Sequence, residues 1–420
     1  MADREYLTVA EALTAILAEI DVLPAETVPL LDGLDRILAE PIMAQDNLPP
    51  FANSAMDGYA VRAADLAGAS RAAPVRLKVT GDIAAGTAPV QAVTSGTAMR
   101  IMTGAPLPPG ADAIVPVEHS NEAWRDPQRS LLSQVEIHQA PKPGDYVRPE
   151  GEDIQAGSLI LAAGHLLRPQ EISILAALGV AQLAVIRRPR VAVLSTGDEL
   201  LPIDQPLQPG KIRNSNSYAQ AAQLLAMGAV PVPLGIARDT EGDVRACLQA
   251  GLDAGVDLFV SSAGVSVGAY DVVKTVLADG GEIGFWRVRM RPGKPLAFGR
   301  YQGVPYLGLP GNPVSAMLSF ERFARPAVRK MAGHTRLDRP EVTAVVQEEI
   351  VSDGRESYIR AVVSREGQQY TARLAGAQGS NIISSLVRAN ALLIVPEGVT
   401  HVAAGGMLAA MMIDWPETVF

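Results

Sequence analysis

Small residues and an aspartate follow a short apolar run in the stretch from Asp257 to Lys274. The run Leu258-Phe259-Val260 is too short for a helix and is typical of a buried parallel strand. The loop after it, Ser261 to Gly268, is rich in serine, alanine and glycine, and a helical pattern begins at Tyr270. Small side chains let a phosphate approach the backbone N–H groups at a helix N-terminus, so this order of elements predicts an anion site.

Asp271 stands in the first turn of that helix and has two interpretations. A carboxylate there could hold Mg²⁺ beside a bound phosphate, because Mg²⁺ prefers oxygen ligands. The commoner role of such a residue is to balance the positive end of its helix. The loop alone does not decide between them.

Similar polar stretches follow other predicted strands, and Asp239 follows a strand that begins at Val230. These stretches are Ser195 to Glu199, Arg287 to Lys294 and Pro310 to Ser315. In open α/β sheets the ligand lies at the carboxyl ends of the strands, so all of these stretches are expected at one edge. The edge would combine hydroxyl groups, three carboxylates (Glu199, Asp239, Asp271) and an Arg/Lys cluster. This inventory favours phosphoryl or nucleotidyl chemistry with a divalent metal. Any one carboxylate is more often a solvated loop residue, so the interpretation depends on the coincidence of several loops.

Several classes of protein are disfavoured by what the 420 residues contain. There is neither a Walker loop nor a Gly-x-Gly-x-x-Gly turn opening a helix. The single cysteine, Cys247, excludes a disulfide framework, and the five histidines show no metal-ligand spacing. A net charge of −9 disfavours an extended nucleic-acid footprint. We expect no membrane contact and a cytoplasmic protein, because no signal peptide or spanning segment is visible.

The N-terminal half predicts scaffold elements around a small β domain. Thr8 to Glu11 is a capping box that opens a helix, and a second short helix is expected over Leu30 to Leu38. The stretch from Asp46 to Arg62 begins with a polar, proline-stiffened loop that contains Asp57, and a strand starts at Tyr59. Short β-type runs follow, over residues 75–80, 97–103, 113–117 and 133–137.

The rest of the chain predicts a helix, an α/β domain and a second β domain. Residues 169–178 form a helix closed by Gly179, and strands and helices alternate from Arg190. A long amphipathic helix runs past Pro326, which should kink it. Alternating runs from Glu341 onward indicate a small β domain. The predicted division is a discontinuous scaffold or dimerisation domain (1–48 and 142–187), an inserted β domain (49–141), an α/β domain (188–332) and a C-terminal β domain (333–420).

Six motifs together resemble one known family, the molybdopterin molybdenumtransferases or MoeA family, which includes the E domains of gephyrin and its plant counterpart. The motifs run in order over almost the whole chain: Asn53 to Arg62, Ile101 to Pro106, Ser195 to Leu200, Gly264 to Gly268, Pro292 to Pro295 and Leu309 to Pro313. The resemblance implies a multidomain α/β plus β fold. That fold has a mostly parallel sheet of the molybdopterin-binding type, an inserted β domain, a barrel-like C-terminal domain and an elongated scaffold.

The resemblance also implies an activity and partners. The family inserts molybdenum from molybdate into adenylylated molybdopterin, cleaving the adenylate with a divalent metal, here Mg²⁺, and releasing AMP. It implies a homodimer whose active cleft lies between the α/β domain of one subunit and the inserted domain of the other. Transient contact with the molybdopterin adenylyltransferase is a further expectation.

When the family's motifs are matched to this sequence, the resemblance assigns roles to individual residues. Asp57 and Thr103 would come from the partner subunit's side of the cleft. Glu199, Asp239 and Asp271 would hold Mg²⁺ and position the phosphoanhydride. The residues expected to bind substrate or nucleotide are Ser266, Arg287, Arg291, Lys294, Pro310, Pro313, Arg355 and Ser380.

Two departures from the family pattern affect the predicted site. Arg287 and Arg291 stand where the family usually has lysines, which changes reach and hydrogen-bond geometry. Ala263 stands where the family often has a glycine, which matters if that position needs a positive φ.

Three alternatives to the transferase stay open at this point. A related enzyme that adenylylates molybdopterin is disfavoured by the long N-terminal and C-terminal regions. A non-catalytic scaffold is disfavoured by the intact set of carboxylates. A paralogue tuned to tungstate is compatible with the sequence, because the two oxyanions are nearly isosteric.

Overall fold

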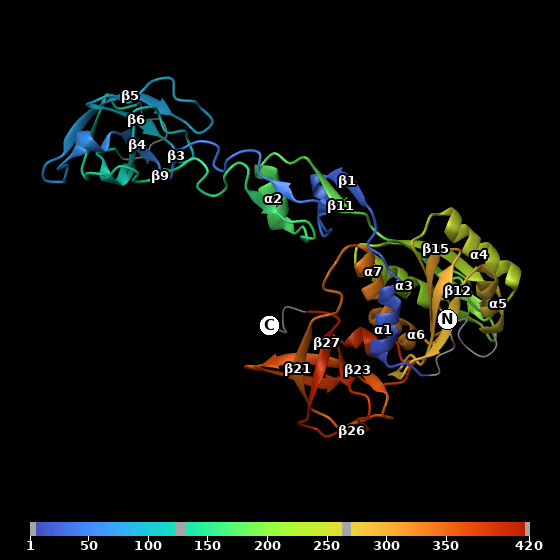
Figure 1. Ribbon diagram of the computed structural model, residues 1–420. Coiled ribbons are helices and arrows are strands. Elements are labelled where there is room, and N and C mark those ends of the chain that lie inside the picture. Colours follow the sequence, from blue (N-terminus) through green and yellow to red (C-terminus); the bar gives the residue numbers. More distant parts are fainter. Residues whose placement is uncertain (1–5, 123–130, 263–269, 416–420) are drawn as a thin grey trace. The chain divides into compact units, whose positions relative to one another are not determined.

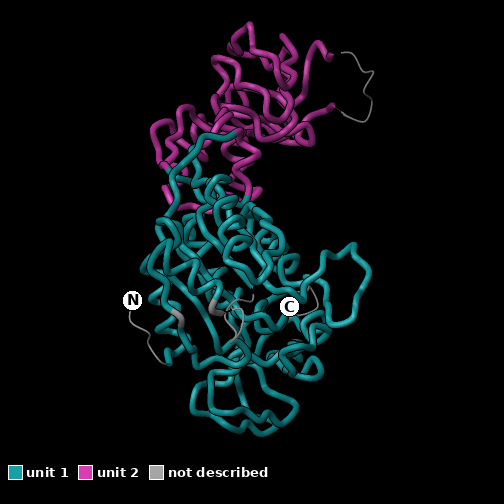
Figure 2. The backbone as a smooth tube through the Cα atoms, turned by 90° about the vertical axis from the view of Figure 1, so that its right-hand side faces the viewer, with its two compact units in different colours: residues 1–28, 35–39, 184–420 teal, residues 29–34, 40–183 magenta. Residues whose placement is uncertain are grey.

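The computed structural model describes residues 6–122, 131–262 and 270–415 (Figure 1). The chain forms two compact units (Figure 2). Unit 1 comprises residues 1–28, 35–39 and 184–420, and unit 2 comprises residues 29–34 and 40–183. Within the described ranges, no helix is both long enough and apolar enough to cross a bilayer.

The centre of unit 1 is a mixed sheet of strands in the order β15-β12-β16-β20-β19-β17. Its strands are β12 (Arg190–Thr196), β15 (Val230–Ala237), β16 (Leu258–Ser262), β17 (Ile283–Arg287), β19 (Pro295–Tyr301) and β20 (Val304–Leu309). The first four in spatial order are parallel, and β19 and β17 are antiparallel to their neighbours. This confirms the mostly parallel sheet, although β19 was not predicted.

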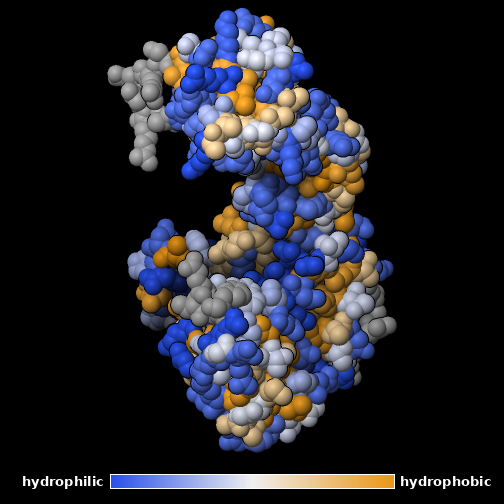
Figure 3. Space-filling view, turned by 90° about the vertical axis from the view of Figure 1, so that its left-hand side faces the viewer, coloured by the Kyte–Doolittle hydropathy of each residue, from blue (hydrophilic) through white to orange (hydrophobic). Residues whose placement is uncertain are grey.

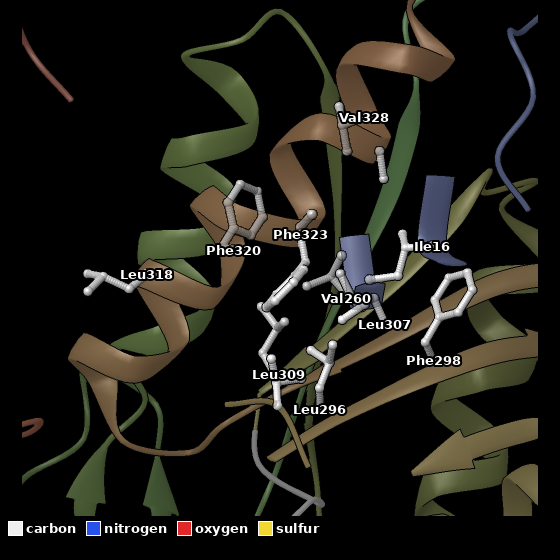
Figure 4. Close-up of a cluster of buried hydrophobic side chains, with 14 of the residues drawn as sticks. Ile16, Val260, Leu296, Phe298, Leu307, Leu309, Leu318, Phe320, Phe323 and Val328 are labelled. Carbon is white, nitrogen blue, oxygen red and sulfur yellow. The ribbon is translucent and has the colours of Figure 1, made fainter. Parts of the chain in front are cut away.

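Helices cover both faces of this sheet, because successive strand residues point to opposite sides. The helices are α1 (Val9–Ala18), α3 (Asn216–Leu225), α4 (Glu241–Asp253), α5 (Tyr270–Gly280), α6 (Pro313–Ser319) and α7 (Arg325–Met331). Val191 and Val193 of β12 pack in one core with α1, α3, α6 and α7. Ala192 and Leu194 pack in the other core with α4 and α5. Figure 4 shows the first core, where Phe323 lies beside Val260 and Leu307.

The long helix expected past Pro326 is interrupted where the sequence predicts a kink. Helix α6 passes into a π-helical turn, Phe320–Ala324, before α7 continues. Proline has no N–H to donate and its ring crowds the carbonyl four residues earlier, so the turn before Pro326 widens. Phe320 and Phe323 of this turn are fully buried, so the widened turn contributes to the core.

The C-terminal part of unit 1 is a closed β-barrel, which confirms the predicted barrel-like domain. Strands β23, β24, β21, β27 and β25 follow one another in space, and the additional β23–β25 pairing closes the ring. Their bounds are β21 (Glu341–Val346), β23 (Glu356–Glu366), β24 (Gln369–Leu374), β25 (Ala391–Val395) and β27 (Met407–Met412). Short pieces accompany them: β22 (Ile350–Val351), β26 (His401–Val402) and helix α8 (Ser384–Arg388).

One short strand, β18 (Met290–Arg291), connects the two parts of unit 1. It belongs to the chain segment between β17 and β19, yet it pairs in parallel with the barrel strand β23. The excursion after β12 contains β13 (Leu200–Leu201) and β14 (Ile212–Arg213), which pair in parallel.

Unit 2 contains the predicted small β domain as a sheet in the order β7-β4-β6-β5-β8. The strands are β4 (Gly58–Val61), β5 (Val75–Ile83), β6 (Thr97–Ile101), β7 (Ala113–Pro116) and β8 (Gln134–Ile137). They match the predicted runs to within a few residues.

The scaffold elements are partly as predicted. They are α2 (Pro169–Ala177) and the strands β1 (Ala25–Pro29), β2 (Ile42–Met43), β3 (Asn53–Ser54), β9 (Val147–Arg148), β10 (Leu159–Leu161) and β11 (Gln182–Ile186). The capping box at Thr8 and the helix closed by Gly179 are confirmed. The helix over Leu30 to Leu38 is wrong: a 3-10 turn, Leu30–Gly33, ends there, and Asp35 has a φ of 60° that no right-handed helix allows.

Figure 3 shows one face of the molecule, where hydrophobic residues are scattered among hydrophilic ones. Singly exposed apolar side chains are normal on protein surfaces and need no special explanation.

Candidate functional site

A cleft of about 1080 Å³ in unit 1 lies between the carboxyl edge of the central sheet and the barrel. Loops after β12, β15 and β20 line one side, and barrel residues from β22, β23 and the segment before α8 line the other. The sequence-predicted residues that line the cleft are Glu199, Asp239, Arg287, Arg291, Lys294, Pro310, Pro313, Arg355 and Ser380. The carboxyl edge of the sheet is where the sequence placed the site.

Glu199 and Asp239 stand on neighbouring loops of the α/β side. Gly197 has a φ of 144°, and a Cβ there would lie 2.4 Å from Glu199 Oε2, so only glycine lets this carboxylate fold back over the turn. The backbone N–H of Asp198 faces Asp239 Oδ2 at 3.4 Å, and the N–H of Asp239 faces Asp198 Oδ1 at the same distance. The two carboxylate-bearing loops are therefore held against each other.

The third predicted carboxylate, Asp271, is the second residue of α5, which begins at Tyr270. Since α5 follows β16, which lies between β12 and β20, its first turn belongs to the same sheet edge. The side chain of Asp271 lies outside the described residues, as do Ser266, Ala263 and the Gly264 to Gly268 motif. Among the described side chains, no group of three potential metal ligands is found. The metal set stays a prediction.

Arg287 ends β17, and the other two cations, Arg291 and Lys294, lie on the segment between β17 and β19. The pairing of β18 with β23 holds this segment, and Glu356 N donates to Arg289 O at 3.1 Å. Gly293 has a φ of 120°, and a Cβ there would lie 2.6 Å from Ser319 Oγ, so the turn that presents Lys294 requires glycine.

The first described residues, Tyr6 and Leu7, support the same segment, and Leu7 forms an isolated β-bridge with Val288. Leu7 N donates to Arg287 O at 2.9 Å, and Arg289 N donates to Leu7 O at 2.8 Å. The Tyr6 ring centroid then lies 5.6 Å from Lys294 Nζ and 5.9 Å from Arg287 Cζ, which is cation–π distance. An aromatic face near both cations offsets part of their mutual repulsion.

Arg355 reaches the cleft from the barrel side with its guanidinium already oriented. Its Nε and Nη2 donate to Asp353, and its Nη1 donates to Met290 O at 3.1 Å. This guanidinium holds the pKa of Asp353 below its usual range, so that carboxyl is ionised at neutral pH. Arg291 Nη1 also approaches Asp353, at 4.0 Å. Asp353 thus holds two cleft arginines in place.

Polar side chains that the sequence analysis did not single out as a set lie beside the Pro310-to-Pro313 turn and at the ends of β12 and β16. Asn216 Nδ2 donates to Gly311 O at 2.7 Å. Ser195 Oγ donates to Asn214 Oδ1 at 3.0 Å and lies 3.1 Å from Ser262 Oγ. Asn214 and Arg360, both buried and both lining the cleft, were missed. Their only sequence signal is a polar residue beside a predicted strand, which is too common to select them.

Asp57 and Thr103 belong to unit 2. Thr103 N and Oγ1 both donate to Asp57 Oδ1, at 2.7 and 2.9 Å. The structure therefore brings these two predicted residues together, with both side chains exposed. Their action across a subunit boundary stays a prediction.

Fold and site together define a multidomain α/β protein with an acidic and basic cleft at the edge of a molybdopterin-binding type of sheet. Three family models match in order: MoeA N-terminal region (domain I and II) over residues 7–179, probable molybdopterin binding domain over 192–330, and MoeA C-terminal region (domain IV) over 343–409.

Relatives and solved structures agree with these matches. Molybdopterin molybdenumtransferase 2 of Mycobacterium tuberculosis is 43% identical over 91% of this chain and 93% of its own length. The molybdopterin molybdenumtransferase of a Nostoc species is 40% identical over 90% and 87%. The crystal structure of the molybdopterin biosynthesis MoeA protein of Pyrococcus horikoshii has a TM-score of 0.81 at 30% identity, covering 98% of this chain and all of that one. The chain belongs to the MoeA family of molybdopterin molybdenumtransferases.

Proposed function

We propose that this protein inserts molybdenum from molybdate into adenylylated molybdopterin, with hydrolysis of the adenylate and release of AMP. The observation that carries the proposal is one cleft that brings together two charged groups. The acidic side is the carboxylates on the loops after β12 and β15, and the basic side is the arginines and lysine from the end of β17, the segment before β19 and the barrel. The family membership gives this cleft its substrates, since the relatives are named molybdopterin molybdenumtransferases.

The acidic side would position the phosphoanhydride. Its donors are carboxylate oxygens, a set that fits Mg²⁺ rather than a softer metal. Glu199, Asp239 and Asp271 are the residues that would hold the ion, which would supply charge neutralisation at the phosphate when bound. The contact between Asp198 and Asp239 holds the loops that carry Glu199 and Asp239 against each other, which supports this proposal.

The basic side would bind molybdate, a tetrahedral dianion. Lys294, Arg291 and Arg355 line the cleft, and guanidinium groups present paired donors that match oxyanions. The sulfur ligands for molybdenum come from the dithiolene of the substrate, so no protein thiol is needed. Cys247 fits no such role, because burial raises the pKa of its thiol and its Sγ faces Leu234 O.

Three further parts of the proposal concern the oligomeric state, a partner enzyme and the location of the protein. A homodimer would bring Asp57 and Thr103 of one subunit to the cleft of the other, as the resemblance implies. Contact with the molybdopterin adenylyltransferase and a cytoplasmic location are predictions from the sequence. The adenylyltransferase alternative gains no support, because MoeA models match on both sides of the α/β domain.

A single-turnover assay with adenylylated molybdopterin, Mg²⁺ and molybdate tests the proposal. The native protein should release AMP only when molybdate is present, and Asp271→Asn should lose most of that release. Native protein that binds the nucleotide without ever releasing AMP would contradict the proposal. Replacing molybdate by tungstate in the same assay separates the transferase from a paralogue tuned to tungsten.

A further inference from the structure

Tyr6 places its aromatic ring beside two cations that line the cleft. The ring centroid lies 5.6 Å from Lys294 Nζ and 5.9 Å from Arg287 Cζ. Both cations are exposed, and among the described residues neither pairs with a carboxylate. Tyr6 precedes the first of the six family motifs, so the resemblance gives it no role. The described neighbour of these two charges is thus an aromatic face and not an acid.

The backbone brings the two cations close to each other. Strands β17 and β19 are antiparallel neighbours, and Arg287 pairs with Pro295, the residue that follows Lys294. Val288 N donates to Lys294 O at 2.8 Å, which closes the turn between the strands. Like charges that a sheet holds side by side repel each other. The negative face of an aromatic ring attracts both cations, so Tyr6 offsets part of this repulsion.

The ring of Tyr6 is held in place by the main chain and not by burial. Leu7 donates one backbone hydrogen bond to Arg287 O and accepts another from Arg289 N. Tyr6 itself is 49% exposed, so little apolar burial stabilises its position. Its φ of 138° lies outside the regions that residues with a Cβ favour. Such strained residues persist where the surroundings fix them, and they concentrate at functional sites.

We propose that Tyr6 is a positioning residue, whose ring holds Arg287 and Lys294 together as a pair for a tetrahedral dianion. This inference rests on the proposed function, which makes that dianion molybdate. An ion with two negative charges can contact both cations at once, so it benefits when their repulsion is already offset. A monoanion that contacts one cation gains little from the pairing. Tyr6 acts through the cations and need not touch the ligand.

Titration of the full chain with two oxyanions tests the pairing. Tyr6→Leu keeps an apolar side chain and removes the aromatic face, so the Kd for molybdate should rise about fivefold. The Kd for perrhenate, a tetrahedral monoanion, should change less than about twofold, because one charge needs only one cation. Native molybdate affinity in Tyr6→Leu, or an equal loss for both oxyanions, would overturn the proposal.

Two further variants separate the ring from other features of the residue. Tyr6→Phe keeps the aromatic face without the hydroxyl and should bind molybdate as the native protein does. Tyr218→Leu removes an exposed tyrosine of α3 that has no cation–π contact within the described residues, so this matched control should also bind as the native protein does. A loss in Tyr6→Phe as large as that in Tyr6→Leu would overturn the role of the ring.

Amide hydrogen exchange at Leu7 separates positioning of the cations from a structural role. The bond from Leu7 N to Arg287 O belongs to the main chain, so exchange in Tyr6→Leu should stay within about twofold of the native rate. Faster exchange in step with weaker binding would show that the ring acts through the backbone and would overturn the proposal. AMP release tests the proposed function separately. Native protein that binds molybdate without releasing AMP would contradict that function, while the titrations would still decide the role of Tyr6.

Discussion

Charged side chains gather in two regions of unit 1, and the regions differ in how completely their charges are paired. The first, here named the ionic junction, is Glu321, Arg325, Arg329, His334 and Arg339. Glu321 accepts from Arg339 at 2.9 and 3.2 Å and from Gln223 at 2.9 Å, and it lies 3.7 Å from Arg325. The second region is the cleft, where Lys294 and Arg287 face an aromatic ring and solvent.

The difference separates charges that stabilise the fold from charges kept for a ligand. The junction joins the π-helical turn to the barrel, because Arg339 also donates to Ile413 O at 2.9 Å. Its acid is 8% exposed, so its ion pairs are shielded from water. The cleft cations remain accessible, as a dianion requires. Variants in the two regions should therefore fail in different ways.

Of the variants considered, Glu321→Gln should have the largest effect, a loss of folding stability. It leaves Arg325 and Arg339 buried or half-buried without their acid, at a cost of about 3 kcal/mol in the free energy of unfolding. Chemical denaturation followed by circular dichroism measures the loss, with the exposed Glu366→Gln as control. Equal stability of the two variants would show that the junction does not stabilise the fold.

Asp239→Asn and Glu199→Gln should lower the activity and leave the stability almost unchanged. Each removes a charge from the acidic side of the cleft, and single-turnover AMP release should fall about 100-fold because charge neutralisation at the phosphate is weakened. The free energy of unfolding should stay within about 0.5 kcal/mol of the native value, since surface changes away from packed features cost little. Full activity in both variants would remove the acidic side from the mechanism.

Lowering the pH should weaken the junction through His334. Burial, with Arg329 and Arg325 nearby, lowers the pKa of His334 to about 4. The unfolded chain binds this proton near pH 6.5 and the folded chain does not, so stability is complete above about pH 6.5 and declines toward pH 4. His334→Gln should flatten that part of the stability profile by an amount smaller than the loss in Glu321→Gln. Parallel native and variant profiles would contradict this assignment.

Arg291→Lys should have the smallest effect. It restores the residue type usual in the family and keeps the charge while losing the planar fork. We expect a change of no more than about threefold in the KM for molybdate, with a shift in the molybdate-to-tungstate ratio of similar size. A tenfold loss would show that the guanidinium of Arg291 is itself required.

The sequence predicts the α/β part well because local pattern and tertiary structure agree there. The strand at Leu258 and the strand that ends before Pro310 both appear as expected. Strand β19 was missed because Pro295 opens it and Gly299 interrupts it, both unfavourable in strands. The helix wrongly predicted over Leu30 to Leu38 has suitable apolar spacing. The backbone at Asp35, however, has a positive φ that a right-handed helix does not allow.

The candidate site was predictable where strand ends determine it. Glu199, Asp239, Lys294 and Pro310 meet because parallel strands end at one edge. Arg355 and Ser380 came only from the family resemblance, since nothing local shows that a barrel will close beside the sheet. Arg360 and Asn214 were missed because their roles depend on burial and on partners far away in sequence. The four-part domain division, unlike the two compact units, stays a prediction.

The most direct test of the account is a molybdate titration of Lys294→Met against the native protein and Arg365→Met. Lys294 has no carboxylate partner among the described residues and lines the cleft, so its removal should weaken molybdate binding at least about tenfold and leave the melting temperature unchanged. The Arg365→Met control should bind as the native protein does. Native affinity in Lys294→Met, or equal losses in both variants, would contradict the claim that the cleft keeps Lys294 free for an oxyanion.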